Sequence, residues 1–278
     1  MIGERGAPTS LANAKRRARG ALLAAVVCLM ACAGPKVPQD SAIPTSPVSG
    51  AGNSMAAPAP RTVETVLDGK RTRVDVFSPL GRSDSAVILV HGFTRTRATM
   101  SGHGQMLAQA GLLAIAPDLP YLVDSRDNAR ALADLVAQVR EGRLAPAAER
   151  IVLVGFSAGG LAALLAAGSP GVVGYIGLDP FDRPSGIGRE FAARLAVPAV
   201  LLRAPPSACN AYSIAAPWAR ALPRLELDRV FDGARHCDFE SPSDWLCRLA
   251  CGAPDPDRQA AIAAEILRVV RGWLLTQQ

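Results

Sequence analysis

A serine stands where an expected β-strand meets an expected helix. The segment IVLVGFSAGGLAALLAA, residues 151–167, begins as an apolar β-branched run and ends in an Ala/Leu-rich helical pattern. Between the two lies a G-x-S-x-G motif, residues 155–159, in the strand–turn–helix setting that a nucleophile elbow requires. Glycines relieve steric clashes in such a sharp turn, and the helix N-terminus favours negative charge beside the serine. Ser157 is therefore the candidate nucleophile.

A nucleophilic serine needs a base, a carboxylate that orients the base, and N–H donors for an oxyanion. The chain has three histidines. His236 follows the last expected strand, whereas His91 ends the first buried strand and precedes Ser157 in the chain. His103 lies between two glycines and is expected on the solvated surface. The candidate base must be sought among these three residues.

The carboxylate is expected at the end of a strand. Asp179 ends the apolar run at residues 172–179, and the following proline keeps it extended. The next expected strand is followed by residues 204–217, which contain no aspartate or glutamate. Asp179 is therefore the preferred acid, with Asp182 as the alternative, whereas Asp118 precedes Ser157.

Four short motifs together resemble the α/β-hydrolase superfamily, over nearly all of residues 62–275. They are VILVHGF (87–93), GFSAGG (155–160), GLDPFD (177–182) and RHCDFE (235–240). Within the superfamily, GLDPFD resembles the Leu-Asp-Pro-x-Asp segment of chlorophyllases, in which the aspartate is the triad acid. The set is also similar to dienelactone-hydrolase-like enzymes and polyester hydrolases.

The resemblance implies a role for each candidate residue. In α/β-hydrolases the catalytic residues follow the chain order serine, acid, histidine. His236 would then be the base and Asp179 the acid, while His91 would be a structural residue that holds its loop. The fold also takes oxyanion donors from the residue after the nucleophile and from the loop after the first core strand. These donors would be the N–H groups of Ala158 and Phe93.

The expected activity is hydrolysis of carboxylic esters through an acyl-enzyme. A peptidase or amidase could use the same residues, and a non-catalytic surface protein with a hydrolase fold is the other alternative. No metal or cofactor is implied. Short segments between strands and helices leave little chain for a lid, so the cleft is expected to be open. The candidates to line it are Phe93, Phe156, Phe181 and Tyr212.

The elements that must position these residues alternate along the chain. Strand-like runs without polar alternation indicate a parallel sheet that is buried on both faces. A hairpin with a turn at Asp68-Gly69 precedes them. The predicted fold class is therefore α/β, a doubly wound and mostly parallel sheet with helices on both faces. Strands are expected at 86–92, 111–118, 150–156, 172–179, 198–204 and 225–231, and helices at about 99–110, 127–141, 158–168, 187–195, 211–221 and 257–275.

The first sixty residues differ in character from the rest. A basic stretch and a short apolar run predict a signal peptide over residues 1–31, and the window Leu29–Cys32 resembles a lipobox that would lipidate Cys32. Residues 32–60 are rich in Pro, Ser, Gly and Ala and are interpreted as a flexible linker to a single domain at 61–278. We therefore expect an exported protein of a bacterial cell envelope, lipid-anchored or else periplasmic or secreted.

Charge and cysteine content agree with export. The net charge of +6 falls to +2 without the signal peptide, which gives no electrostatic footprint for nucleic acid. The oligomeric state is left open, with a monomer favoured. Four cysteines remain in the domain, and disulfides suit an oxidising compartment. The predicted pairs are Cys209–Cys237, which would tie two site loops together, and Cys247–Cys251.

Overall fold

The computed structural model describes residues 59–275, and these contain one sheet of eight strands. The strand order is β1-β2-β4-β3-β5-β6-β7-β8. The signal peptide, the linker and Cys32 lie outside the described residues, so their predictions are not tested. The strands are β1 (Arg61–Leu67), β2 (Lys70–Phe77), β3 (Ser85–Val90), β4 (Leu113–Pro117), β5 (Arg150–Phe156), β6 (Val172–Leu178), β7 (Ala199–Arg203) and β8 (Leu225–Val230).

The sheet is antiparallel at one edge and parallel elsewhere. β1 and β2 form a hairpin whose turn, Asp68-Gly69, has φ angles of 49° and 74°, the left-handed values that such a two-residue turn requires. β2 pairs with β4 in antiparallel fashion, and the strands from β4 to β8 run parallel. The predicted α/β class, a mostly parallel and doubly wound sheet, is confirmed.

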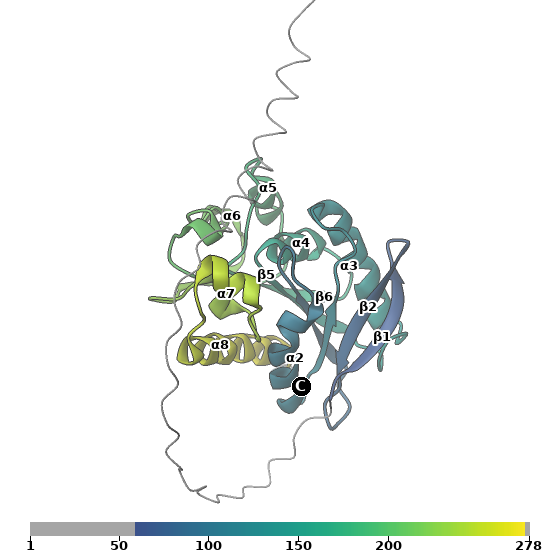
Figure 1. Ribbon diagram of the computed structural model, residues 1–278. Helices are drawn as coiled ribbons and strands as arrows, with labels where there is room; N and C mark the ends of the chain where they lie inside the picture. The colour runs from purple at the N-terminus through teal and green to yellow at the C-terminus, as the bar shows by residue number, and fades with distance from the viewer. Residues whose placement is uncertain (1–58, 276–278) are drawn as a thin grey trace, which may run out of the picture. The chain divides into compact units, whose positions relative to one another are not determined.

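Helices cover both faces of the sheet, and each face has its own hydrophobic core (Figure 1). On one face, α3, α4, α5 and α6 pack over Ile88 and Leu153; on the other, α2 and α8 pack over Leu89 and Val154. Neighbouring positions of β3 and β5 thus belong to opposite cores, as the alternation of side chains along a strand requires. Burial on both faces explains why these strands show no polar alternation. The helices are α2 (Ser101–Gln109), α3 (Ser125–Arg140), α4 (Ala158–Ala166), α5 (Ile187–Ala192), α6 (Trp218–Ala221), α7 (Trp245–Cys251) and α8 (Pro256–Leu274).

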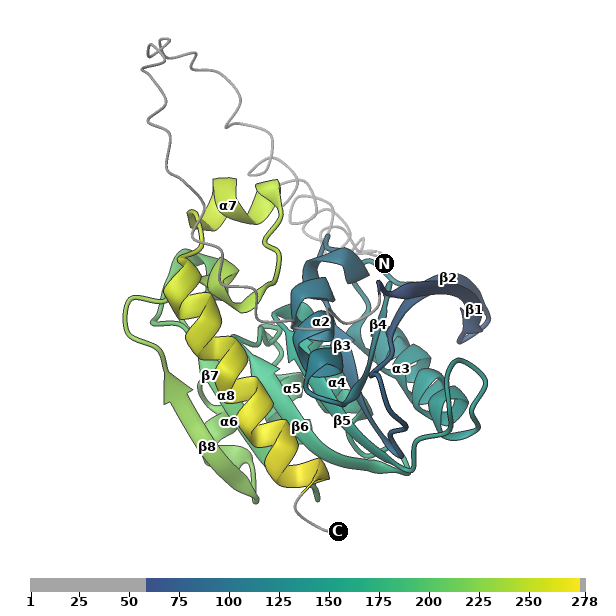
Figure 2. The ribbon, with the colours of Figure 1, turned by 90° about the horizontal axis from the view of Figure 1, so that it is seen from below.

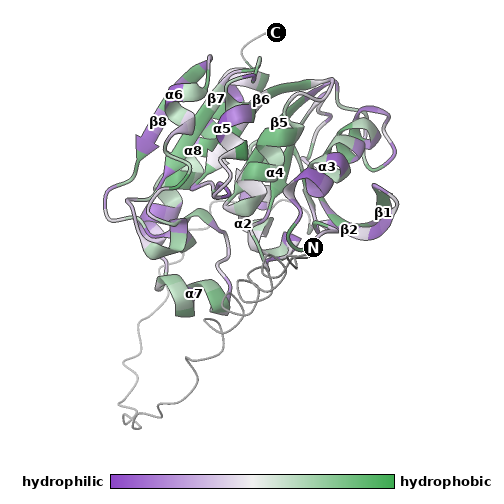
Figure 3. Ribbon diagram, turned by 90° about the horizontal axis from the view of Figure 1, so that it is seen from above, coloured by the Kyte–Doolittle hydropathy of each residue, from purple (hydrophilic) through white to green (hydrophobic). Residues whose placement is uncertain are grey.

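The helix that carries Ser157 at its N-terminus is apolar almost all round. Figure 3 shows hydrophobic residues along the centre of the sheet and on α4, whereas α3 also carries hydrophilic ones. All but two residues of α4 are buried, because it is enclosed by the sheet, α3 and α5. A helix without a polar face is one that is buried on all sides. The turn before α4 is therefore held by packing rather than by exposed caps.

Two helices differ from the prediction. The helix expected at 211–221 begins only at Trp218, because Ala211, Tyr212 and Ser213 all have φ between 45° and 60°. Left-handed L-residues cannot continue a right-handed helix. The helix α7 was not among the predicted ones, although Asp244 caps its N-terminus and Gly252, with a φ of 86°, ends it. Within residues 59–275, no helix is long and apolar enough to cross a membrane.

Candidate active site

Ser157 stands alone between β5 and α4, in a backbone conformation that residues other than glycine seldom adopt. Its φ of 53° and ψ of −124° place it outside the regions favoured for L-residues. Strain of this kind persists only where the surroundings determine the conformation. Here Ser157 N–H donates to the carbonyl of Leu178, and its own carbonyl accepts from the N–H groups of Gly160 and Phe181. These bonds tie the turn to the end of β6.

Glycine is needed beside the serine because two segments approach closely there. A Cβ on Gly159 would lie 2.1 Å from the carbonyl oxygen of His91, and one on Gly155 would lie 2.5 Å from the carbonyl oxygen of Gly159. Neither distance is possible for a real side chain. The glycines of the motif therefore allow α4 to begin directly against the ends of β3 and β5.

Three polar side chains form a chain of hydrogen bonds at the carboxyl ends of the strands. Nε2 of His236 lies 3.0 Å from Oγ of Ser157, and Nδ1 of His236 lies 2.6 Å from Oδ2 of Asp179. His236 begins the short 3₁₀ helix η3 (His236–Phe239), which follows β8, and Asp179 follows β6 directly. This order of atoms lets the imidazole accept the serine proton while the carboxylate holds the other ring nitrogen.

The carboxylate of Asp179 is itself held by neighbours. Its Oδ1 accepts from the N–H of Ala204 at 3.0 Å and from Nδ2 of Asn210 at 3.2 Å. Asn210 is fully buried in the 3₁₀ helix η2 (Ala208–Asn210), and its amide group also bonds Ser207, Ser213 and Pro205. The segment at 204–217, which contains no carboxylate, thus supplies the groups that orient the carboxylate of Asp179. The sequence reasoning missed Asn210.

Asp182 does not reach His236. Its carboxylate accepts from the backbone N–H groups at the start of α5, those of Gly188 and Arg189, and from Nε1 of Trp218 at 2.7 Å. The N–H of the next residue, Arg183, also donates to it, so every hydrogen bond of this buried carboxylate within residues 59–275 comes from an N–H donor. The structure therefore brings Asp179, and not the alternative, to the histidine.

The two other histidines differ in their surroundings but are both buried. Nε2 of His91 accepts from the N–H of Leu119 at 2.9 Å, and its Nδ1 lies 2.8 Å from the carbonyl oxygen of Gly92. Burial lowers the pKa of His91, and the neutral ring joins its loop to the end of β4. His103 was expected at the surface, but it is 1% exposed and lies 3.1 Å from the carbonyl oxygen of Phe239. The expectation was wrong because α2 turns this position inward, towards Phe239 of η3.

The candidate oxyanion donors belong to two backbone segments close to Ser157: Ala158 follows it, and a Cβ built on Gly92, the residue before Phe93, would lie 3.1 Å from Cβ of Ser157. Ala158 is the first residue of α4, so its N–H has no acceptor within the helix. Phe93 follows β3 in a tight turn that the bond from Arg95 N–H to Gly92 C=O closes at 3.2 Å. Both N–H groups thus belong to segments that end at the carboxyl edge of the sheet.

Of the four aromatic residues expected to line a cleft, Phe156 does not. It is only 1% exposed, and its ring packs against the imidazole of His236 at 4.6 Å between centroids. The prediction that Phe156 lines a cleft was wrong, because its side chain is part of the core around β5. Phe93 and Tyr212 are exposed by 50% and 75%, and Phe181 is partly exposed.

The disulfide pairing differs from the prediction. Cys209 is bonded to Cys251 and Cys237 to Cys247, with Cα–Cα distances of 5.9 and 5.8 Å. Cysteines four residues apart share one side of α7 and cannot bond each other within a regular helix. Instead α7, which Figure 2 shows above the upper end of α8, packs against both η2 and η3, and each of its cysteines bonds to one of them. Within the described part of the chain, the only group with metal-ligand spacing is formed by Cys237, Cys247 and Cys251, but their sulfurs are already in disulfides.

The two disulfides should differ in their contribution to stability. They close loops with sequence separations of 42 and 10 residues. Loop entropy predicts losses in the free energy of unfolding of about 4 kcal/mol for Cys209→Ala/Cys251→Ala and about 3 kcal/mol for Cys237→Ala/Cys247→Ala. Urea unfolding of both double variants measures this difference, and non-reducing peptide mapping checks the pairs. A larger loss from the shorter loop would contradict the prediction.

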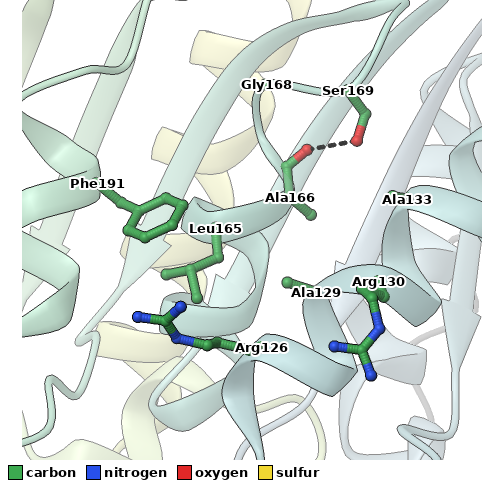
Figure 4. Close-up of a pocket in the computed structure, with 9 residues that line it drawn as sticks. All are labelled: Arg126, Ala129, Arg130, Ala133, Leu165, Ala166, Gly168, Ser169 and Phe191. Carbon is green, nitrogen blue, oxygen red and sulfur yellow. Dashed lines mark hydrogen bonds between the residues drawn. The ribbon is translucent and has the colours of Figure 1, made fainter.

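A surface pocket of about 420 Å³ lies away from these residues (Figure 4). It is lined by Arg126 and Arg130 of α3, by Leu165 at the far end of α4, and by Phe191 of α5. Ser157 precedes the other end of α4, roughly 12 Å away along the helix axis at 1.5 Å per residue. The pocket is therefore not the site of the candidate chemistry.

The comparisons with known proteins identify the class of this chain. Residues 87–276 match the model of the alpha/beta hydrolase family, so the chain belongs to that family and is a hydrolase. Its structure is similar to that of a dienelactone hydrolase from Anabaena variabilis, with a TM-score of 0.62. The sequences are 16% identical, and the match covers 78% of this chain and 99% of the other. A search of curated proteins found no match.

Proposed function

We propose that the protein is a serine hydrolase that cleaves carboxylic esters through an acyl-enzyme. The observation that carries the proposal is the hydrogen-bond chain from Ser157 through His236 to Asp179. Strain at the serine and the close glycine contacts support it, because both belong to the turn that exposes the hydroxyl.

Each group has a defined task in the proposed reaction. Nε2 of His236 takes the proton of Ser157 as Oγ attacks the ester carbonyl, and Asp179 stabilises the resulting imidazolium. The N–H groups of Phe93 and Ala158 hold the oxyanion. The alcohol leaves with the proton from His236, and the serine remains acylated. Water then attacks the acyl group and gives a proton to His236, which passes it to Oγ of Ser157 as the acid is released.

Exposed apolar side chains favour an ester substrate with apolar groups. Phe93 and Tyr212 come from segments that also carry the proposed oxyanion donor and the support of Asp179. The name of the structurally similar dienelactone hydrolase, an enzyme for a cyclic ester, agrees with this class of substrate. We propose that Phe93, Phe181 and Tyr212 contact the substrate.

The test combines active-site labelling with turnover. The purified, oxidised protein is treated with a fluorophosphonate probe, and the labelled peptide is identified by mass spectrometry. Hydrolysis is then measured on p-nitrophenyl esters of graded acyl length and on a matched p-nitroanilide. We expect the label on Ser157 and turnover of the esters only. Preferred cleavage of the anilide would indicate an amidase, and failure to label would support a protein without catalysis.

We also propose that the protein is exported and anchored through a lipid on Cys32. The two disulfides support export, because such bonds persist in oxidising compartments. Mass spectrometry of the N-terminal peptide of the mature protein is expected to find a diacylglyceryl-modified Cys32 as first residue. An unmodified start at Ala33 or beyond would contradict the anchor and leave a periplasmic or secreted protein.

A further inference from the structure

The loop that carries the proposed oxyanion donor Phe93 is exposed, and a buried ion pair holds it. Phe93 and Thr94 are exposed, and Thr94 has a φ of 58°. Arg97 fixes the far end of the loop through Asp118 and Asp75. Some other contact must hold the middle of the loop, where the orientation of the Phe93 peptide is set.

The side chain of Arg95 makes that contact. Its Nε donates to Oε1 of Glu240 at 2.8 Å and lies 3.4 Å from Oδ2 of Asp244. Its Nη1 donates to the hydroxyl of Thr94 at 3.1 Å, and that hydroxyl donates to the carbonyl of Phe93 at 2.7 Å. A continuous series of hydrogen bonds therefore runs from Glu240 to the backbone of Phe93.

Glu240 is a firm anchor for this series. It follows η3 directly and lies four residues after His236. Nε2 of Gln259 in α8 donates to its backbone carbonyl at 2.6 Å. The next residue, Ser241, bonds the backbone of Thr99 and Gly102 at the start of α2. The same segment that presents the base thus also holds the loop with the oxyanion donor.

The arrangement carries an energetic cost. The carboxyl group of Glu240 is fully buried, and within residues 59–275 its Oε2 accepts no hydrogen bond of good geometry. Burial is the main reason why the pKa of Glu240 is raised to about 7; the charge of Asp244 contributes to the rise, whereas Arg95 and the backbone N–H of Asp244 oppose it. A buried charge with an unsatisfied oxygen lowers the stability of the fold, so this carboxylate is better explained by a purpose other than stability. Its place between the two halves of the site indicates what that purpose is.

We propose that Arg95 and Glu240 are positioning residues, whose ion pair aligns the Phe93 N–H with the oxyanion that forms beside Ser157. The inference rests on the proposed function. Neither side chain touches the reacting atoms; both act through the backbone of Phe93. Loss of the pair should therefore lower kcat and leave the KM of the ester nearly unchanged.

The variants Glu240→Gln and Arg95→Met test the proposal on a p-nitrophenyl ester. An oxyanion donor is worth about 10²–10³ in kcat, and a misaligned donor should cost part of this, about 10- to 100-fold. The double variant should lose little more than either single variant, because each already breaks the pair. The matched control is Glu265→Gln. Glu265 is a buried glutamate of α8 that pairs with Arg229 of β8 and Arg268 of α8, away from the loop. This control variant should keep wild-type kcat.

A pH profile gives a readout that a purely structural role would not move. As pH falls through about 7, Glu240 takes up a proton and the pair with Arg95 loses its charge. The kcat of the wild type should then fall through a step near pH 7 that is absent from the profile of Glu240→Gln. Parallel acid limbs in the two proteins would overturn the proposal.

Hydrogen exchange separates this proposal from the proposed function. Amides of residues 92–96 should exchange about ten-fold faster in Glu240→Gln and Arg95→Met than in the wild type, even if no ester is turned over. Unchanged exchange would overturn the positioning role. Faster exchange with wild-type kcat would also overturn it, because the aligned loop would then not matter for turnover. A wild type that exchanges normally but hydrolyses no ester would refute the proposed function alone.

Discussion

Ser157→Ala is expected to abolish ester hydrolysis while leaving the fold intact. By analogy with serine proteases, loss of the nucleophile lowers kcat by about 10⁶-fold. The variant should also lose all fluorophosphonate labelling. Stability should change by about 1 kcal/mol or less, because the hydroxyl bonds only to Nε2 of His236 and alanine keeps the same backbone strain.

The assay must distinguish a dead site from an unfolded protein. Circular dichroism and urea unfolding of Ser157→Ala provide this control. Retention of more than a small fraction of wild-type kcat, with contamination excluded by a second purification, would show that another residue is the nucleophile. The covalent mechanism would then be wrong, although the family assignment would stand.

Asp179→Asn should lower kcat by up to about 10⁴-fold for a reason that the hydrogen bonds specify. Oδ1 of Asp179 accepts from both Ala204 N–H and Asn210 Nδ2. The single oxygen of an asparagine would take that place and turn its NH₂ group towards Nδ1 of His236. The imidazole would then carry its proton on Nε2 and could not accept one from Ser157. Steady-state kcat on a short p-nitrophenyl ester measures this loss.

Asp182→Asn is the matched control, because it changes a neighbouring buried aspartate in the same way. All recorded partners of Asp182 are N–H donors, so an NH₂ group there would face a donor. We expect a loss of about 1–3 kcal/mol in the free energy of unfolding. Its kcat should remain near that of the wild type. Collapse of activity in Asp182→Asn, with Asp179→Asn active, would show that the acid was assigned wrongly.

The local patterns of the sequence predicted the sheet well, and with it the strand ends after which Ser157, Asp179 and His236 occur. Ser157 and Asp179 directly follow β5 and β6, which are apolar and buried strands, whereas His236 comes soon after the more polar edge strand β8. In a parallel sheet the carboxyl ends of the strands meet at one edge, so chain position alone brings these residues near one another. Their mutual distances follow from the fold and not from any long-range pattern.

The rest depended on contacts between distant segments, which leave little trace in one sequence. Asn210 could be found only by asking which side chain would satisfy Asp179, and no local pattern marks it. The disulfide pairing depended on α7, whose two cysteines bond to different segments. His103 and Phe156 were misplaced because their burial depends on distant segments: His103 lies against Phe239 of η3, and Phe156 lies in the core around β5 and against the ring of His236. In each case the outcome depends on tertiary contacts.

The disulfides of the short helix α7 make the alignment of the site depend on oxidation of the cysteines. Through its cysteines α7 is bonded to η2, which orients Asp179, and to η3, which begins with His236. A newly made chain with reduced thiols lacks both ties, so we expect it to be a poor catalyst until it is oxidised. Turnover by the double cysteine variants checks this expectation. If the protein is exported as proposed, it would gain its activity only after it has left the reducing cytoplasm. It would then not hydrolyse esters inside the cell that makes it.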